Sequence, residues 1–271
     1  MTDDERLDDV ANHAGINADS FEEIRNCISD DILSKYDVYS YRHAASILKN
    51  SFSSELNEIE EALRAFNITL DEIAKPGGSE SDMPKKISNS LRPKKWFETK
   101  IQGDLIVRVH EHSEEILSTG KIKKHTLPER DPVTLKNYID GHKIDYVKGR
   151  VALDMEWNSK DQTFDRDLYA FRMFHECGII SLAVILTRST DLNEIFNELP
   201  LKKKDGSIDR NDDGSQKLCK QKYGASTTWM GKLLYRLNAG RHGGCPVLVL
   251  GIRREAISDL NELRMTQGEN E

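Results

Sequence analysis

Apolar and polar positions alternate strictly along residues 151–158, the pattern of a β-strand whose two faces differ. One face collects large apolar side chains, namely Val151, Leu153, Met155 and Trp157. The other face collects Ala152, Asp154, Glu156 and Asn158. The alternation therefore places two carboxylates, two residues apart, on the same face of one short strand.

The pattern of the remaining chain predicts a mixture of strands and helices. Continuous apolar runs at 178–187 and 246–252 predict strands buried on both faces, and alternation at 105–109 predicts another strand. Apolar residues recur every three or four positions in three stretches, which predicts helices over 38–76, 165–176 and 229–238. Strands that alternate with helices indicate an α/β fold with a central mixed β-sheet flanked by helices.

Charge and composition divide the chain but do not identify a partner. Residues 1–35 hold ten acids and three bases, which accounts for the whole net charge of −7. We expect an acidic N-terminal helical extension at 1–37, a main domain at 38–255 with a long polar loop at 202–222, and a polar tail at 256–271. Because the rest of the chain is neutral, charge is uninformative about nucleic acid.

The chain begins without an apolar leader and has no run of about 18 apolar residues, so we expect a cytoplasmic protein. The four cysteines lack the spacing of a zinc site and are expected to be free, buried thiols.

Three carboxylates surround the alternating strand and form the strongest candidate site. Asp145 precedes the strand, and Asp154 and Glu156 lie on it. Clustered carboxylate oxygens suit a hard divalent cation, and such a cation activates water for phosphodiester hydrolysis. The backbone carbonyl of Met155 is a further candidate ligand, and Glu98, in a segment that looks helical, is a further candidate catalytic acid. Ordinary acids on a solvated strand face would show the same spacing.

Two short polar segments are candidates for contacts with DNA. Asn158, Ser159 and Lys160 follow the acidic strand directly, and Ser226, Thr227 and Thr228 precede the predicted helix at 229–238. Small polar side chains read base edges or contact phosphates. The same residues also form ordinary turns and helix caps, and both interpretations stay open.

The run IDYVKGRVALDMEWNSK at 144–160 resembles the catalytic segment of the BglII/BstYI group of type II restriction endonucleases, within the PD-(D/E)xK nuclease superfamily. That group's pattern is an Asp, eight residues, then acid-x-Gln or acid-x-acid and an aromatic residue. The present chain has it as Asp145, Asp154, Glu156 and Trp157. The resemblance extends over roughly 38–255.

The resemblance implies a restriction-endonuclease-like core and Mg²⁺-dependent cleavage of both strands of a short palindromic DNA site by a homodimer. It implies that Asp145 and Asp154 hold the metal, while Glu156 stands where relatives carry lysine or glutamine. Ser226 and the residues after Trp157 would contact bases or phosphates. The alternatives are a structure-specific or repair nuclease on the same core, and a DNA-binding protein without catalysis.

Overall fold

The computed structural model describes residues 16–76, 82–141 and 143–261, which fall into two compact units. The larger unit contains the chain up to Thr99 and from Ile144 onward, and the smaller one is Lys100–Lys143. The expected extension at 1–37 and tail at 256–271 lie partly outside the described residues. The boundaries at 37 and 255 therefore stay a prediction.

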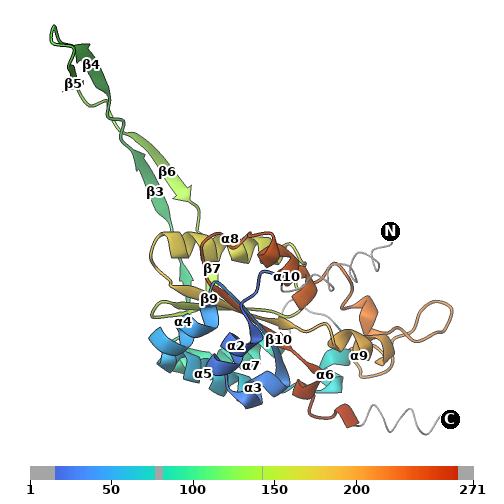
Figure 1. Cartoon of the computed structure of the whole chain (residues 1–271). Coiled ribbons are helices and arrows are strands. Elements are labelled where there is room, and N and C mark those ends of the chain that lie inside the picture. The colour runs from blue at the N-terminus through green and yellow to red at the C-terminus, as the bar shows by residue number, and fades with distance from the viewer. Residues whose placement is uncertain (1–15, 77–81, 142, 262–271) are drawn as a thin grey trace. The chain divides into compact units, whose positions relative to one another are not determined.

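A mixed six-stranded sheet forms the centre of the larger unit, in the order β1-β10-β9-β8-β7-β2 (Figure 1). Its strands are β1 (Tyr36–Tyr41), β2 (Phe97–Lys100), β7 (Lys143–Lys148), β8 (Val151–Glu156), β9 (Leu182–Arg188) and β10 (Val247–Ile252). The central trio β8, β9 and β10 is parallel, while β1 and β7 pair antiparallel with β10 and β8. The predicted α/β class and mixed sheet are confirmed.

Helices cover both faces of this sheet (Figure 1). One layer contains α2 (Phe21–Cys27), α3 (Asp30–Lys35), α4 (Ala44–Ser51), α5 (Ser53–Ala65), α6 (Leu70–Ala74) and α7 (Asp82–Leu91). The other side carries α8 (Thr163–Glu176) and α10 (Met230–Asn238), and α9 (Leu192–Glu198) follows β9. The main apolar core joins Leu153 and Met155 of β8 to Leu48 and Ile59 of the first layer. The acidic face of β8 is therefore on the side of α8.

The prediction of one helix over 38–76 is wrong at its start and in its continuity. Residues 36–41 form edge strand β1, which pairs with β10 from Tyr36↔Ile252 to Tyr41↔Val247. The segment YDVYSY is rich in tyrosine and contains a valine, and both residue types favour a strand. Phe52, with φ −139° and ψ 45°, separates α4 from α5, and Phe66 ends α5 before α6, so the predicted range contains three helices in sequence.

The smaller unit is a ribbon of antiparallel strand pairs. It pairs β3 (Gly103–Val107) with β6 (Val133–Ile139), and β4 (His112–Ile116) with β5 (Ile122–Thr126). The predicted strand at 105–109 overlaps β3. Most ribbon residues are exposed, including several large apolar side chains: Ile106, Val107, Ile116, Ile122, Val133, Leu135 and Tyr138. We refer to Lys100–Lys143 as the ribbon.

The polar segment at 202–222 is largely irregular, as predicted. It contains two isolated bridges, Lys202↔Ile208 and Arg210↔Gln216, and ends in a short 3-10 turn at Cys219–Gln221. Among the described residues, no helix is long and apolar enough to cross a membrane. All four cysteines are free thiols; three are buried as expected, whereas Cys177 is exposed.

Candidate active site

Asp154 and Glu156 lie side by side on the inner face of β8, as the alternation predicts. The two residues are only 4% and 7% exposed, so the alternative of a solvated strand face is wrong. Val151, Leu153 and Met155 point to the opposite face, into the apolar core. Because the Met155 side chain packs in the apolar core, Met155 could bind a cation only through its backbone carbonyl. That role stays a prediction.

Asp145 is brought to Asp154 by the antiparallel pairing of β7 with β8. The register Tyr146↔Leu153 sets Asp145 beside Asp154, and the Asp145 backbone N–H donates to Asp154 Oδ1 at 2.7 Å. The Arg92 guanidinium donates to the Asp145 carbonyl at 2.9 Å and fixes the end of β7. The structure thus brings together the two acids predicted to bind metal, although Asp145 is exposed and Asp154 is buried.

A fourth carboxylate, Asp167 of α8, joins this group and was not singled out from the sequence. It is 3% exposed, and Arg166 Nη2 lies 3.2 Å from Asp167 Oδ1 and 3.9 Å from Glu156 Oε1, which places the two acids around one guanidinium group. Phe164, Leu168 and Phe171 form the buried stripe of α8, and Asp167 falls within that stripe. An acid in the apolar stripe of a helix was the signal that could have found it.

Burial and mutual repulsion raise the pKa of these acids. Desolvation raises the pKa of Asp154 well above its usual value, and the charges of Asp167 and Asp145 raise it further. The pKa of Asp167 rises to about 8, mainly because of burial and then because of the charge on Glu156. Burial also raises the pKa of Glu156, which the Ser159 hydroxyl and Arg166 oppose. The site is therefore short of positive charge.

The oxygen atoms of this site fit a divalent cation. Asp154 Oδ2, Glu156 Oε2 and Asp167 Oδ2 are all buried and accept no hydrogen bond from any described group. Buried carboxylate oxygens are costly unless they are paired or coordinate a metal. Hard oxygen ligands of this kind are those that Mg²⁺ and Ca²⁺ prefer.

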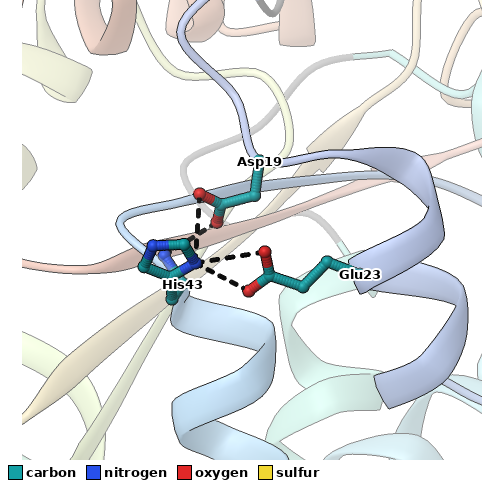
Figure 2. Close-up of side chains that lie close together, drawn as sticks. All are labelled: Asp19, Glu23 and His43. Carbon is teal, nitrogen blue, oxygen red and sulfur yellow. Dashed lines mark hydrogen bonds and ion pairs between the residues drawn. The ribbon is translucent and has the colours of Figure 1, made fainter.

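Among the described residues, one set of three side chains has ligand atoms within 4.8 Å of one another, and it lies elsewhere (Figure 2). His43 Nδ1 is 2.8 Å from Glu23 Oε1, and Asp19 Oδ2 accepts from the His43 backbone N–H at 2.8 Å and the Ser40 hydroxyl at 2.6 Å. The Glu23 carboxylate raises the pKa of His43. The three side chains are paired by these hydrogen bonds and charges, which join the start of α2 to the start of α4.

Glu98 does not lie in a helix, which corrects the prediction for its segment. It is on β2, the strand next to β7 in the sheet, and it is exposed. The neighbouring Trp96 is fully buried and donates through Nε1 to Glu58 at 2.8 Å. A catalytic role for Glu98 stays a prediction.

The two predicted DNA-contact segments lie beside each other. Lys160 forms a bridge with Thr227, and the Thr228 backbone N–H donates to the Ser159 carbonyl at 2.8 Å. Ser159, Lys160 and Ser226 are exposed, and Asn158 and Thr227 are half-buried. Thr228 is fully buried, so its side chain is not available for a contact with DNA. The end of β8 thus continues into a polar surface made from two distant parts of the sequence.

Arg188, at the end of β9, holds this double segment together and was missed from the sequence. Its guanidinium donates to the carbonyls of Trp157 (2.7 Å) and Thr228 (2.8 Å) and to Thr227 Oγ1 (2.7 Å). It also lies over the rings of Phe196 and Tyr223 at 5.2 and 4.9 Å. Burial lowers its pKa to about 10, so it stays charged at neutral pH. No sequence pattern marks this arginine.

The mixed sheet, with buried acids on a central strand, defines a restriction-endonuclease-like α/β core. A family model described as restriction endonuclease BglII/BglIII matches residues 36–252, well over half of the chain. The protein belongs to this family of DNA-cleaving nucleases. Restriction endonucleases generally use a divalent metal. No curated protein matches the chain.

Proposed function

We propose that the protein is a type II restriction endonuclease of a restriction-modification system. It would act in the cytoplasm as a homodimer on a short palindromic DNA site, with Mg²⁺ as its metal. The observation that carries this proposal is the set of three buried carboxylate oxygens without a hydrogen-bond donor, on Asp154, Glu156 and Asp167. They lie within the region that matches a family of DNA endonucleases.

Asp145 and Asp154 would hold the metal. When bound, Mg²⁺ supplies a water of lowered pKa and neutralises charge on the phosphate. The Asp145 backbone N–H fixes Asp154 Oδ1 at 2.7 Å, which leaves Oδ2 as the oxygen without a partner. Asp154 is buried, and the lower dielectric around it strengthens the electrostatic interactions that it makes.

Glu156 would orient the attacking water or accept its proton. Burial raises the pKa of Glu156, and a raised pKa makes a carboxylate a better proton acceptor. Exposed Ser159, Lys160 and Ser226, at the end of the same strand, are positioned to contact phosphates or base edges.

Digestion of plasmid DNA tests the proposal. Purified protein with Mg²⁺ should give discrete bands, and EDTA or the variant Asp154→Asn should abolish them. Glu176→Gln, an exposed acid at the far end of α8 that pairs with Arg172, is the matched control and should cut normally. Sequencing of the cut ends should show a palindromic site.

Other outcomes would select other functions. Cleavage that ignores sequence and depends on branches or lesions would indicate a structure-specific or repair nuclease. Binding of DNA with no cleavage of any substrate in Mg²⁺ would indicate a non-catalytic DNA-binding protein. Sedimentation of the protein with its DNA site tests the homodimer separately.

A further inference from the structure

The cluster of Asp19, Glu23 and His43 brings one imidazole and two carboxylates to a single point on the N-terminal helical layer. Asp19 and Glu23 lie at the start of α2, and His43 lies in the turn between β1 and α4. Figure 2 shows both carboxylates turned toward the His43 ring. The proposed cleavage of DNA uses none of these residues, so the cluster needs an explanation of its own.

Asp19 is held by one oxygen and leaves the other without a donor. Its Oδ2 accepts from the Ser40 hydroxyl at 2.6 Å and from the His43 backbone N–H at 2.8 Å. Its Oδ1 accepts no hydrogen bond from any described group, although the side chain is only 9% exposed. The two bonds to Oδ2 orient the carboxylate in the way that outer partners orient a metal ligand, and Oδ1 faces His43 Nδ1 at 3.8 Å.

The cluster is short of positive charge. Its two carboxylates face one imidazole, which carries at most one positive charge. The hydrogen bond to Glu23 and then the charges of Glu23 and Asp19 raise the pKa of His43, so a proton on this ring is the counter-charge within the cluster. A divalent cation in place of that proton would balance both carboxylates.

The ligand types and their spacing suit Zn²⁺. Zn²⁺ binds imidazole nitrogen and carboxylate oxygen at about 2.0 Å in tetrahedral geometry, so its ligands stand roughly 3.3 Å apart. His43 Nδ1 is 2.8 Å from Glu23 Oε1 and 3.8 Å from Asp19 Oδ1, and these distances lie on either side of that spacing. An imidazole ligand favours a transition metal over Mg²⁺ or Ca²⁺, which prefer oxygen. The His43 side chain is 71% exposed, so water can supply a fourth ligand.

We propose that Asp19, Glu23 and His43 bind one divalent transition-metal ion, of which Zn²⁺ is the type, with water as the fourth ligand. His43 releases its Nδ1 proton to solvent, and the nitrogen lone pair and one oxygen of each carboxylate bind the ion. The ion ties α2 to the start of α4 and stabilises the folded chain. The inference does not depend on the proposed nuclease function, because it uses none of the acids around β8.

Calorimetric titration of the full chain with Zn²⁺ at about pH 8, where less proton competes for the imidazole, tests the inference. Asp154→Asn is the parent variant, because it removes a carboxylate of the proposed Mg²⁺ site. The parent should bind one Zn²⁺ that is lost when His43→Gln or Glu23→Gln is added. His125→Gln is the matched control, because His125 Nε2 is 2.9 Å from Glu115 Oε2 but belongs to no set of three ligands among the described residues. It should keep the ion.

Thermal unfolding gives a second measurement. Zn²⁺ should raise the melting temperature of the parent, and adding His43→Gln should remove this increase. A parent that binds no Zn²⁺, or binding that survives His43→Gln unchanged, would overturn the inference and leave the cluster as an ion pair only. Far-ultraviolet circular dichroism establishes that each variant is folded, and titration of the wild-type chain in excess Mg²⁺ gives the same comparison without Asp154→Asn.

Discussion

Replacement of Arg188 by methionine should destabilise the protein strongly, because it removes a buried donor on which three acceptors depend. Methionine keeps most of the apolar length of the side chain but donates no hydrogen bond. The carbonyls of Trp157 and Thr228, now 2.7 and 2.8 Å from guanidinium nitrogens, would be left buried without a donor.

The magnitude follows from the two carbonyls. A buried acceptor that loses its donor costs about 1–3 kcal/mol, so the two together cost roughly 2–6 kcal/mol. Part of this loss of stability is offset, because the variant no longer has to remove the guanidinium charge from water when it folds. We expect a net loss of about 3 kcal/mol from a free energy of unfolding that is on the order of 5–15 kcal/mol.

Urea denaturation followed by circular dichroism at pH 7 measures this loss as a shift of the midpoint at constant slope. Arg150→Met is the matched control, because Arg150 also donates to a carbonyl and a hydroxyl, those of Gly178 and Ser181, but at an exposed position. Water replaces those bonds, so we expect a change within about 0.5 kcal/mol. Equal midpoints for the two variants would refute the reasoning.

Three further predictions concern the buried acids, the first two in EDTA and the third in calcium. The pKa of Asp167 is about 8 in the folded protein, against an ordinary value of 3.8. Between about pH 4 and pH 8 the folded state therefore keeps a proton that the unfolded chain has already released. The free energy of unfolding should therefore fall as pH rises through this window, by up to about 1.4 kcal/mol per pH unit, in urea titrations at several pH values. Asp167→Asn should flatten the slope, and an unchanged slope contradicts the assignment. Asp154→Asn should raise the melting temperature in EDTA above about pH 8, where Asp167 is ionised, because it removes a carboxylate whose charge is disfavoured by burial and by the charges of Asp167 and Asp145; a lower melting temperature would count against this reasoning. Calcium should then raise the melting temperature less in this variant than in wild type.

The sequence predicts the centre of the fold well because the centre obeys simple periodicities. Strict alternation sets Asp154 and Glu156 on one face of β8, and continuous apolar runs mark β9 and β10 as doubly buried. Edge strand β1 was missed because its burial is mixed and the helical spacing that follows it is strong. Local patterns therefore identify elements best where burial is uniform.

The candidate site was only partly predictable, because half of it depends on tertiary pairing. The grouping of Asp145 with Asp154 was predicted from their proximity in the sequence, but the β7–β8 register that joins them was not. Asp167 and Arg188 owe their roles to contacts between different helices, strands and loops. No local sequence pattern predicts which arginine will be buried. In the ribbon, the strand at 105–109 was predicted, but β4, β5 and β6 were missed because most of their residues are exposed and create no period of burial.

The ribbon enters and leaves the core between β2 and β7, which are neighbours in the sheet. The 44 residues of Lys100–Lys143 form a compact unit of their own, separate from the unit that contains the six-stranded sheet. Insertions at such a place change the length of the chain without changing the order of the strands. The junction is therefore a natural point at which evolution or protein engineering can exchange one surface module for another while the acids of β7 and β8 keep their register.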